Sequence, residues 1–263
     1  MFFLSEDINT PIEKETDIIP IIKNAFYKEL LKKKLKSATE IGVGFGIADI
    51  VFYDLDQKVV QERIVSGLCK PLLSEDLIKT LLAFKPYEIV SVTYLMEKLP
   101  FSKERLKYKL LKFLKENNYV TKISSDKFRS NFNYCIGLNK VIAVEAKLNN
   151  WKRGLYQAYR YKWFSDESYL AIYSYGIKPA KEKIDLFKKL NVGLLEVKDS
   201  SVDVIFNPRP EAPYSEIMWA LTFEYLFDLE QKENGELRSN KSLLERLKNF
   251  LPNFQEFSSR LTF

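Results

Sequence analysis

Two charged side chains interrupt an otherwise apolar stretch, Val141-Ile-Ala-Val-Glu-Ala-Lys147. Charged groups are costly in such a segment unless a partner or a ligand offsets their desolvation. Glu145 and Lys147 are two residues apart, so on a strand both project from the same face. A carboxylate can bind a hard divalent cation, and a neighbouring lysine can orient or deprotonate a water molecule and stabilise developing phosphate charge. The pair therefore predicts metal-dependent chemistry at a phosphate.

A second apolar run, from Glu40 to Tyr53, contains Asp49 between Ile-Ala and Ile-Val-Phe. If the two runs form neighbouring strands, Asp49 is the natural second ligand of the same cation. Oxygen ligands in a chain without histidine favour Mg²⁺ or Mn²⁺ over zinc. We therefore expect a magnesium or manganese site between these strands.

The composition excludes several other classes of site. With no histidine, the chain has no Ser-His-Asp triad, no Cys-His pair and no Cys2His2 zinc site. The two cysteines, Cys69 and Cys135, lack CxxC spacing and indicate neither a disulfide framework nor a thiolate metal cluster. The first residues turn acidic at Glu6 and Asp7 instead of forming a secretory signal, and no uncharged apolar run approaches the roughly 18 residues of a membrane span. We expect a cytoplasmic protein without membrane contact.

The excess positive charge lies in one part of the chain. Residues 85–130 contain 11 Lys and Arg against five Asp and Glu, and the rest of the chain has 30 of each sign. Such a concentration is typical of a surface that binds a polyanion. The alternative is a well-solvated, lysine-rich surface.

Within this segment the pattern predicts a helix from about Lys103 to Glu116, capped by Ser102. Its expected core face consists of Leu106, Leu110, Phe113 and Leu114. Its opposite face is basic with one aromatic residue, and we expect it to bind nucleic acid through Arg105, Tyr108, Lys109, Lys112 and Lys115.

The neighbouring elements complete a recognisable order. Short helices are expected at 74–84 and 93–99, and strands at 119–123 and 128–136 around a polar turn. Three helices followed by a hairpin resemble a winged helix-turn-helix module over residues 73–134. That resemblance implies that the helix from Lys103 is the recognition helix, that the hairpin is the wing, and that the partner is DNA. Alternatively, the module docks on the rest of the protein or on another partner.

Three motifs together resemble the RecB-like branch of the PD-(D/E)xK nucleases, also called restriction-endonuclease-like. They are Gly46-Ile-Ala-Asp-Ile-Val51, Val144-Glu-Ala-Lys147 and Gln157-Ala-Tyr-Arg-Tyr161, within residues 15–56 and 139–206. The resemblance implies that Asp49, Glu145 and the backbone carbonyl of Ala146 bind the metal. It also implies that Lys147 positions the attacking water.

By the same resemblance, Gln157 and Tyr161 line the site and touch the nucleic-acid backbone; four residues apart, they share one helix face. The family also carries an acidic residue on its N-terminal helix, expected here at about 18–36. Glu29 is the candidate and Glu40 its competitor, and the sequence does not separate them. Lys152 and Arg153 begin the helix that contains Gln157, where they could meet a phosphate.

The expected fold is α/β: a restriction-endonuclease-like core with a mixed central β-sheet flanked by helices, plus an inserted winged-helix domain. After the helix with Gln157 we expect a strand at 169–175, a helix at 179–190 and a hairpin of strands 192–198 and 202–206. The expected domains are the first part of the core (1–56), the insert (57–138), the second part of the core (139–210) and C-terminal helices (211–263). Those helices, at 215–229 and 242–250, would pack on the core or form a dimer.

The leading hypothesis is a Mg²⁺-dependent deoxyribonuclease that grips DNA with its winged helix. A non-cleaving winged-helix DNA-binding protein or regulator is the alternative, and a nuclease acting on RNA or branched DNA shares the same site. Cutting both strands of a duplex usually requires two active sites, so we expect a homodimer. A different protein partner is also an expectation. The sequence identifies no interface for either.

Overall fold

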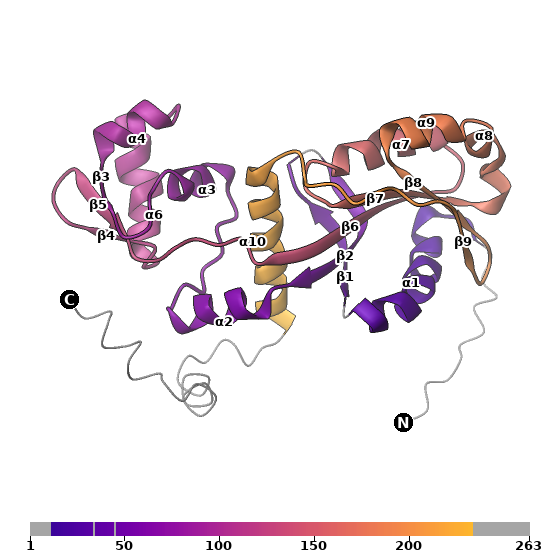
Figure 1. Ribbon diagram of the computed structural model, residues 1–263, viewed down its shortest axis with the longest axis horizontal. Coiled ribbons are helices and arrows are strands. Elements are labelled where there is room, and N and C mark those ends of the chain that lie inside the picture. The colour runs from indigo at the N-terminus through magenta and orange to yellow at the C-terminus, as the bar shows by residue number, and fades with distance from the viewer. Residues whose placement is uncertain (1–11, 34, 45, 234–263) are drawn as a thin grey trace, which may run out of the picture. The chain divides into compact units, whose positions relative to one another are not determined.

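The computed structural model describes residues 12–33, 35–44 and 46–233, and the side chains of 27–33 and 233 lie outside this description. Figure 1 shows the chain, which folds into two compact units. Within the described residues, the first unit contains the chain up to Asp54 together with Leu138–Met218. The second contains Leu55–Gly137 and the chain from Trp219 onward.

The first unit is built on a mixed six-stranded sheet with the order β1-β2-β6-β7-β8-β9. Its strands are β1 (Lys36–Gly42), β2 (Ile47–Leu55), β6 (Leu138–Lys147), β7 (Glu167–Tyr173), β8 (Gly193–Val197) and β9 (Val202–Phe206). Its helical elements are η1 (Glu15–Ile18), α1 (Ile19–Lys33), α7 (Trp151–Tyr161), η3 (Ser174–Gly176), α8 (Lys178–Lys181) and α9 (Ile184–Leu190). β6, β7 and β8 are parallel, whereas β1 pairs with β2, and β8 with β9, in antiparallel fashion. The expected α/β class with a mixed sheet flanked by helices is confirmed.

Strands β2 and β6 are neighbours in this sheet although unit two separates them in the sequence. The side chain of Asn139 donates a hydrogen bond to Asp54 Oδ2 (3.0 Å), and the N–H of Ala146 donates one to Asp49 Oδ2 (2.7 Å). These two contacts run in opposite sense along the strands, so β2 and β6 are antiparallel. The two apolar runs thus form neighbouring strands, which is the condition under which Asp49 was expected to join Glu145.

Helices cover both faces of the sheet (Figure 1). On one face, residues of α1 pack against alternate residues of β6, namely Ile142, Val144 and Ala146. On the other face, α7, α8 and α9 pack against β7 and β8. Because side chains alternate along a strand, Glu145 and Lys147 project from β6 toward the face that α7 covers.

The expected strand-like run from Glu40 to Tyr53 is wrong as a single strand, because the chain reverses within it. β1 ends at Gly42 and β2 begins at Ile47. Gly44 (φ 56°) and Gly46 (φ 155°) have backbone angles that favour glycine, and Val43 donates a hydrogen bond to Gly46 O (3.2 Å). The expected N-terminal helix at 18–36 ends by Lys33, and the helix at 179–190 is interrupted between α8 and α9.

The second unit contains helices and a small sheet of order β3-β5-β4. Its elements are α2 (Gln57–Val65), α3 (Glu75–Leu82), β3 (Ile89–Ser91), α4 (Val92–Lys98), α5 (Lys103–Arg105), a π-helical segment (Leu106–Leu110), α6 (Leu111–Glu116), β4 (Val120–Lys122), β5 (Lys127–Ser130) and, from Trp219, α10 (Glu216–Glu233). The expected helices of this region are present, and β4 and β5 form the expected hairpin, but β5 ends at Ser130 and not at Ile136. The sequence analysis missed α2 and β3. The expected helix at 242–250 lies outside the described residues.

The π-helical segment changes which side of the helix 103–116 is buried. Leu106, Leu110, Leu111 and Leu114 are buried, whereas Phe113, expected in the core, is only half-buried. The Leu111 N–H donates to Leu106 O, an i to i+5 bond that shifts the phase of the residues after it. Within the described residues, no helix combines the length and the apolar character that crossing a membrane would require.

A buried ion pair joins distant segments of the second unit. Both terminal nitrogens of Arg63 lie 2.7 Å from the carboxylate of Glu224, and the two residues are 4% and 0% exposed. Tyr134 and the N–H of Leu72 donate to the same carboxylate at 2.8 and 2.7 Å, and Arg63 also contacts the Tyr119 hydroxyl. The pair therefore links α2, the chain before β4 and α10.

Candidate active site

Glu145 and Lys147 form an ion pair at the end of β6, with Lys147 Nζ 2.7 Å from Glu145 Oε1. Only 1% of Glu145 and 7% of Lys147 is exposed. The ammonium also contacts Glu15 Oε2 (2.9 Å) and donates to the Ala146 carbonyl (3.0 Å). Burial acts to lower the pKa of Lys147, but the hydrogen bonds to Glu145 and Glu15 outweigh it and raise the pKa. Lys147 is therefore a cation at neutral pH.

Asp49 lies on the neighbouring strand, and its Oδ2 accepts the N–H of Ala146. In the described part of the chain, Asp49 forms no ion pair and its Oδ1 has no hydrogen-bond partner. Burial raises the pKa of Asp49 against the effects of that hydrogen bond and of Lys147. Burial also raises the pKa of Glu145, and the negative charge of Asp49 adds to this increase. Because the charge of Asp49 disfavours the ionised form of Glu145, a cation placed near both carboxylates would be stabilising.

Tyr161 and Gln157 come from α7, on the same side of the sheet. The Tyr161 hydroxyl lies within hydrogen-bonding distance of the Glu145 carboxylate and of the Ile47 carbonyl (2.7 Å), and donates its one hydrogen to either. Burial and the charge of Glu145 raise the pKa of Tyr161, so the hydroxyl stays protonated. The side-chain oxygen Oε1 of Gln157 is buried and has no hydrogen-bond partner among the described residues. Because an unsatisfied buried acceptor is costly, this amide is suited to bind a water molecule or a substrate group.

One acidic residue of the N-terminal segment, Glu15, reaches this group of side chains, and the sequence analysis missed it. Glu15 lies in η1, before α1, and its carboxylate reaches Lys147. Glu29 lies within α1, but its side chain is outside the described part of the structure. Glu40 is exposed at φ 55°, and its charge contributes to the raised pKa of Asp49.

The donor set agrees with Mg²⁺ in kind and number. Asp49, Glu145 and the Ala146 carbonyl offer hard oxygen atoms, and Mg²⁺ typically takes one or two carboxylates and completes its shell with water and substrate phosphate. Among the described residues, no group of three or more His, Cys, Asp or Glu side chains could hold a metal ion. The residues present therefore fit a cation that is shared with substrate better than one enclosed by protein.

The basic residues expected to bind nucleic acid differ in how freely they reach solvent. Arg105 forms an ion pair with Asp76, and Lys112 lies 4.0 Å from Glu116. Lys109 and Lys115 are exposed without an ion pair within the described residues, and Tyr108 is 69% exposed. Lys152 and Arg153 are exposed in the first turn of α7. Arg105 is thus the least available member of the expected set.

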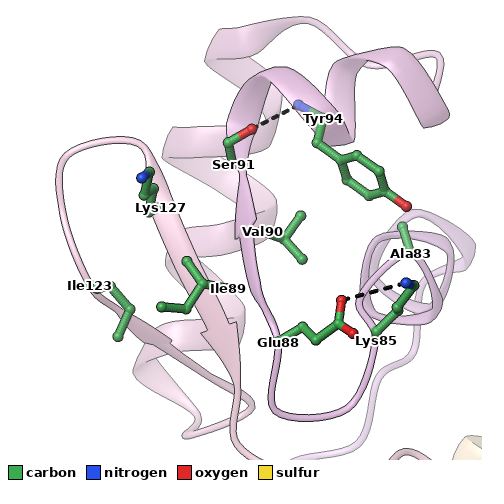
Figure 2. A pocket seen from close by; sticks show the side chains of 9 residues that line it. All are labelled: Ala83, Lys85, Glu88, Ile89, Val90, Ser91, Tyr94, Ile123 and Lys127. Carbon is green, nitrogen blue, oxygen red and sulfur yellow. Dashed lines mark hydrogen bonds and ion pairs between the residues drawn. The ribbon is translucent and has the colours of Figure 1, made fainter.

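A pocket of about 580 Å³ lies in the second unit, bordered by β3, α4 and the hairpin. Figure 2 shows Val90 and Ile89 beside it and the ion pair of Lys85 with Glu88 at one side. None of the expected catalytic residues lines this pocket. Its one carboxylate is already paired with a lysine, so the pocket lacks the carboxylate pair that metal-dependent chemistry needs.

Gly154 allows α7 to lie close to β6 and β7. A Cβ atom there would lie 2.6 Å from Leu170 Cδ1 and 2.8 Å from Lys147 Cγ. We expect Gly154→Ala to destabilise the protein by about 1–3 kcal/mol through overpacking, although alanine is better in a helix by about 1 kcal/mol. Urea unfolding measures the change. Arg153→Ala, the exposed neighbour, is the control and should stay within about 0.5 kcal/mol of the parent. A Gly154→Ala variant more stable than the parent would contradict the close packing.

Comparisons with protein-family models, with curated proteins and with solved structures give no match to this chain.

Proposed function

We propose that this protein is a metal-dependent DNA nuclease of the PD-(D/E)xK type. The observation that carries the proposal is the joining of Asp49, from β2, with Glu145 and Lys147, from β6, although 96 positions separate Asp49 from Glu145. Unpaired charge in a sheet is expensive, and here three charged groups are held together at one place. A structural ion pair alone would not need the third group, Asp49.

The order of elements supports the same proposal. In the first unit, α1, β1, β2, β6, α7 and β7 follow one another as helix, three strands, helix and strand. This is the α-β-β-β-α-β order of the fold that the motifs resemble. The helix with Gln157 and Tyr161 directly follows the strand with Glu145, and Tyr161 contacts Glu145.

In this proposal each side chain has a distinct role. Asp49, Glu145 and the Ala146 carbonyl hold the cation, which when bound neutralises charge on the phosphate. Lys147 would hold the attacking water by exchanging its hydrogen bond to the Ala146 carbonyl for one to the water, and its raised pKa makes it a poor base. Tyr161 keeps the Glu145 carboxylate in place, and Glu15 keeps the Lys147 ammonium in place. Gln157 contributes its amide to the substrate backbone.

We further propose that the second unit is a winged-helix module that binds DNA. Its elements follow the order α3, β3, α4, the helix 103–116, β4 and β5, in which the last two strands form the wing. The helix 103–116 presents Lys109, Lys112 and Lys115 to solvent. These lysines form the surface that would meet phosphates in the groove.

Replacing two of these lysines should weaken DNA binding in a salt-dependent manner. For Lys109→Gln/Lys112→Gln we expect the slope of log K against log salt to become shallower by about two, since each lost phosphate contact releases about one counterion fewer. Titration of labelled duplex at several salt concentrations measures this slope. The matched control is Lys58→Gln/Lys85→Gln, which removes two exposed lysines of the same unit whose side chains are 83% and 70% exposed. Equal slopes for both double variants would reject the helix 103–116 as the binding surface.

The nuclease proposal is tested by cleavage of labelled single-stranded, duplex and branched DNA with Mg²⁺ or Mn²⁺, against EDTA. We expect products that depend on the metal and are lost in Lys147→Ala. Lys162→Ala is the control, because Lys162 is similarly buried and ion-paired, to Glu211, but takes no part in the site. Tight binding of DNA without cleavage of any substrate would favour a non-cleaving regulator.

A further inference from the structure

The outer face of α7 combines positive charge with an exposed aromatic ring. The helix contains Lys152, Arg153 and Arg160 and no acidic residue. Tyr156, in its middle, is 65% exposed. The guanidinium of Arg160 lies over the Tyr156 ring, 5.8 Å from its centroid. An aromatic side chain that is this exposed contributes little to the core, so another role accounts better for it.

Tyr156 differs in this respect from the other aromatic residues at the end of the helix. Tyr159 and Trp163 both pack edge-on against Tyr214, with ring centroids 6.5 and 6.3 Å apart. Those contacts hold the segment before α10 against α7. Tyr156 has no ring contact of this kind among the described residues, and the guanidinium of Arg160 lies over its ring.

The exposed ring and its cation lie next to the catalytic side of the same helix. Successive residues are rotated by about 100° around a helix axis. Seen down the axis, Arg160 therefore lies about 60° from Gln157, and Tyr156 lies about 100° from Gln157 in the same direction of rotation. Tyr161 contacts Glu145 in the acidic site, and Gln157, four residues before it, shares its face of the helix. Around the circumference of α7, the face with Gln157 and Tyr161 is therefore followed first by Arg160 and then by the exposed ring of Tyr156.

We propose that Tyr156 and Arg160 form a stacking platform for an unpaired base of a single DNA strand next to the scissile phosphate; this inference rests on the proposed nuclease function. The ring stacks on the base, and Arg153 and Arg160 contact the phosphates on either side. Positively charged grooves with exposed aromatic rings are the means by which proteins bind single strands, because each base offers a flat face. In a duplex both faces of a base are already stacked, so this platform selects single-stranded or frayed DNA over paired DNA.

The test measures binding of labelled oligothymidine in EDTA by fluorescence anisotropy. Tyr156→Ala is expected to weaken binding by between about 5-fold and 100-fold, and Tyr156→Trp to restore it. An oligonucleotide of the same length without bases should bind the parent and Tyr156→Ala equally, because it retains the phosphates and lacks the stacking partner. Tyr175→Ala is the matched control, since Tyr175 belongs to the same unit and is 61% exposed. It should bind oligothymidine as the parent does.

The outcomes separate this inference from the proposed function. If Tyr156→Ala binds oligothymidine as tightly as the parent, or loses the same affinity for the strand without bases, the stacking platform is rejected even if the protein cleaves DNA. If the parent never cleaves DNA with Mg²⁺ but the loss in Tyr156→Ala depends on bases, the platform stands and the nuclease proposal fails.

Discussion

The variant Asp49→Asn is expected to lose between about 10²-fold and 10³-fold in DNA cleavage while remaining at least as stable as the parent. Burial raises the pKa of Asp49, so at neutral pH its ionised form is disfavoured by the folded protein. Asparagine removes that charge, and its side-chain oxygen still accepts the N–H of Ala146. What it removes is a charged ligand of the cation. A residue whose replacement helps the fold and harms the reaction is present for function.

Asp166→Asn is a close control for this substitution. Asp166 is half-buried, its pKa is also raised by burial, and it accepts the N–H of Val141 on β6 at 2.7 Å, the same length as the bond from Ala146 to Asp49. Among the described side chains, no hydrogen bond or ion pair joins Asp166 to a predicted catalytic residue. Cleavage rates with Mg²⁺ and urea unfolding curves should be measured for both variants. Equal cleavage by Asp49→Asn and the parent would exclude Asp49 as a ligand, and an equal loss in both variants would show a general effect of disturbing β6.

The part of the site that the sequence predicted depends on local spacing. Two residues on a strand must face the same side, and two residues four apart on a helix must share a face, so the pairs Glu145 with Lys147 and Gln157 with Tyr161 needed only the correct element type. The prediction that Asp49 joins this group depended on a condition. It required that β2 and β6 become neighbours although more than 80 residues of the second unit lie between them in the sequence. No local pattern determines which distant strands become neighbours.

The contact of Glu15 with Lys147 was not predicted because the sequence analysis began the helix at about 18 and left out the short 3₁₀ turn η1 (Glu15–Ile18) before it. Asp17 accepts the N–H groups of Glu13 and Lys14 at 3.0 and 2.8 Å, and thereby fixes a turn before α1. That turn brings Glu15 to Lys147. Lys14 stands at the cap position, and a lysine cannot accept a backbone N–H, so the sequence lacked the Ser, Thr, Asp or Asn that marks a helix start. The π-helical segment at Leu106–Leu110 likewise carried no signal, since its composition also suits an α-helix.

The ion pair of Arg63 with Glu224 could not be predicted from local sequence patterns either, because the two residues are 161 positions apart. Its energy should nevertheless be large, and Arg63→Ala is expected to destabilise the second unit by about 3–5 kcal/mol. The substitution leaves the Glu224 carboxylate without its cation in a fully buried place, and it also removes hydrogen bonds to the carbonyls of Leu68 and Lys70. The ring of Phe227, 4.3 Å from the guanidinium carbon, loses its contact as well.

Amide hydrogen exchange measures this effect unit by unit. In Arg63→Ala, exchange should accelerate in α6, β4 and α10, whereas β7 and β8 of the first unit provide an internal control. Arg105→Ala breaks the more exposed ion pair with Asp76 in the same unit and should cost less than about 1 kcal/mol. The double variant Arg63→Ala/Glu224→Ala should be destabilised by less than the sum of the two single variants, because it leaves no buried charge unpaired. Additive losses would mean that the two side chains act independently, and that the contacts of Arg63 with the backbone and the aromatic rings carry its contribution.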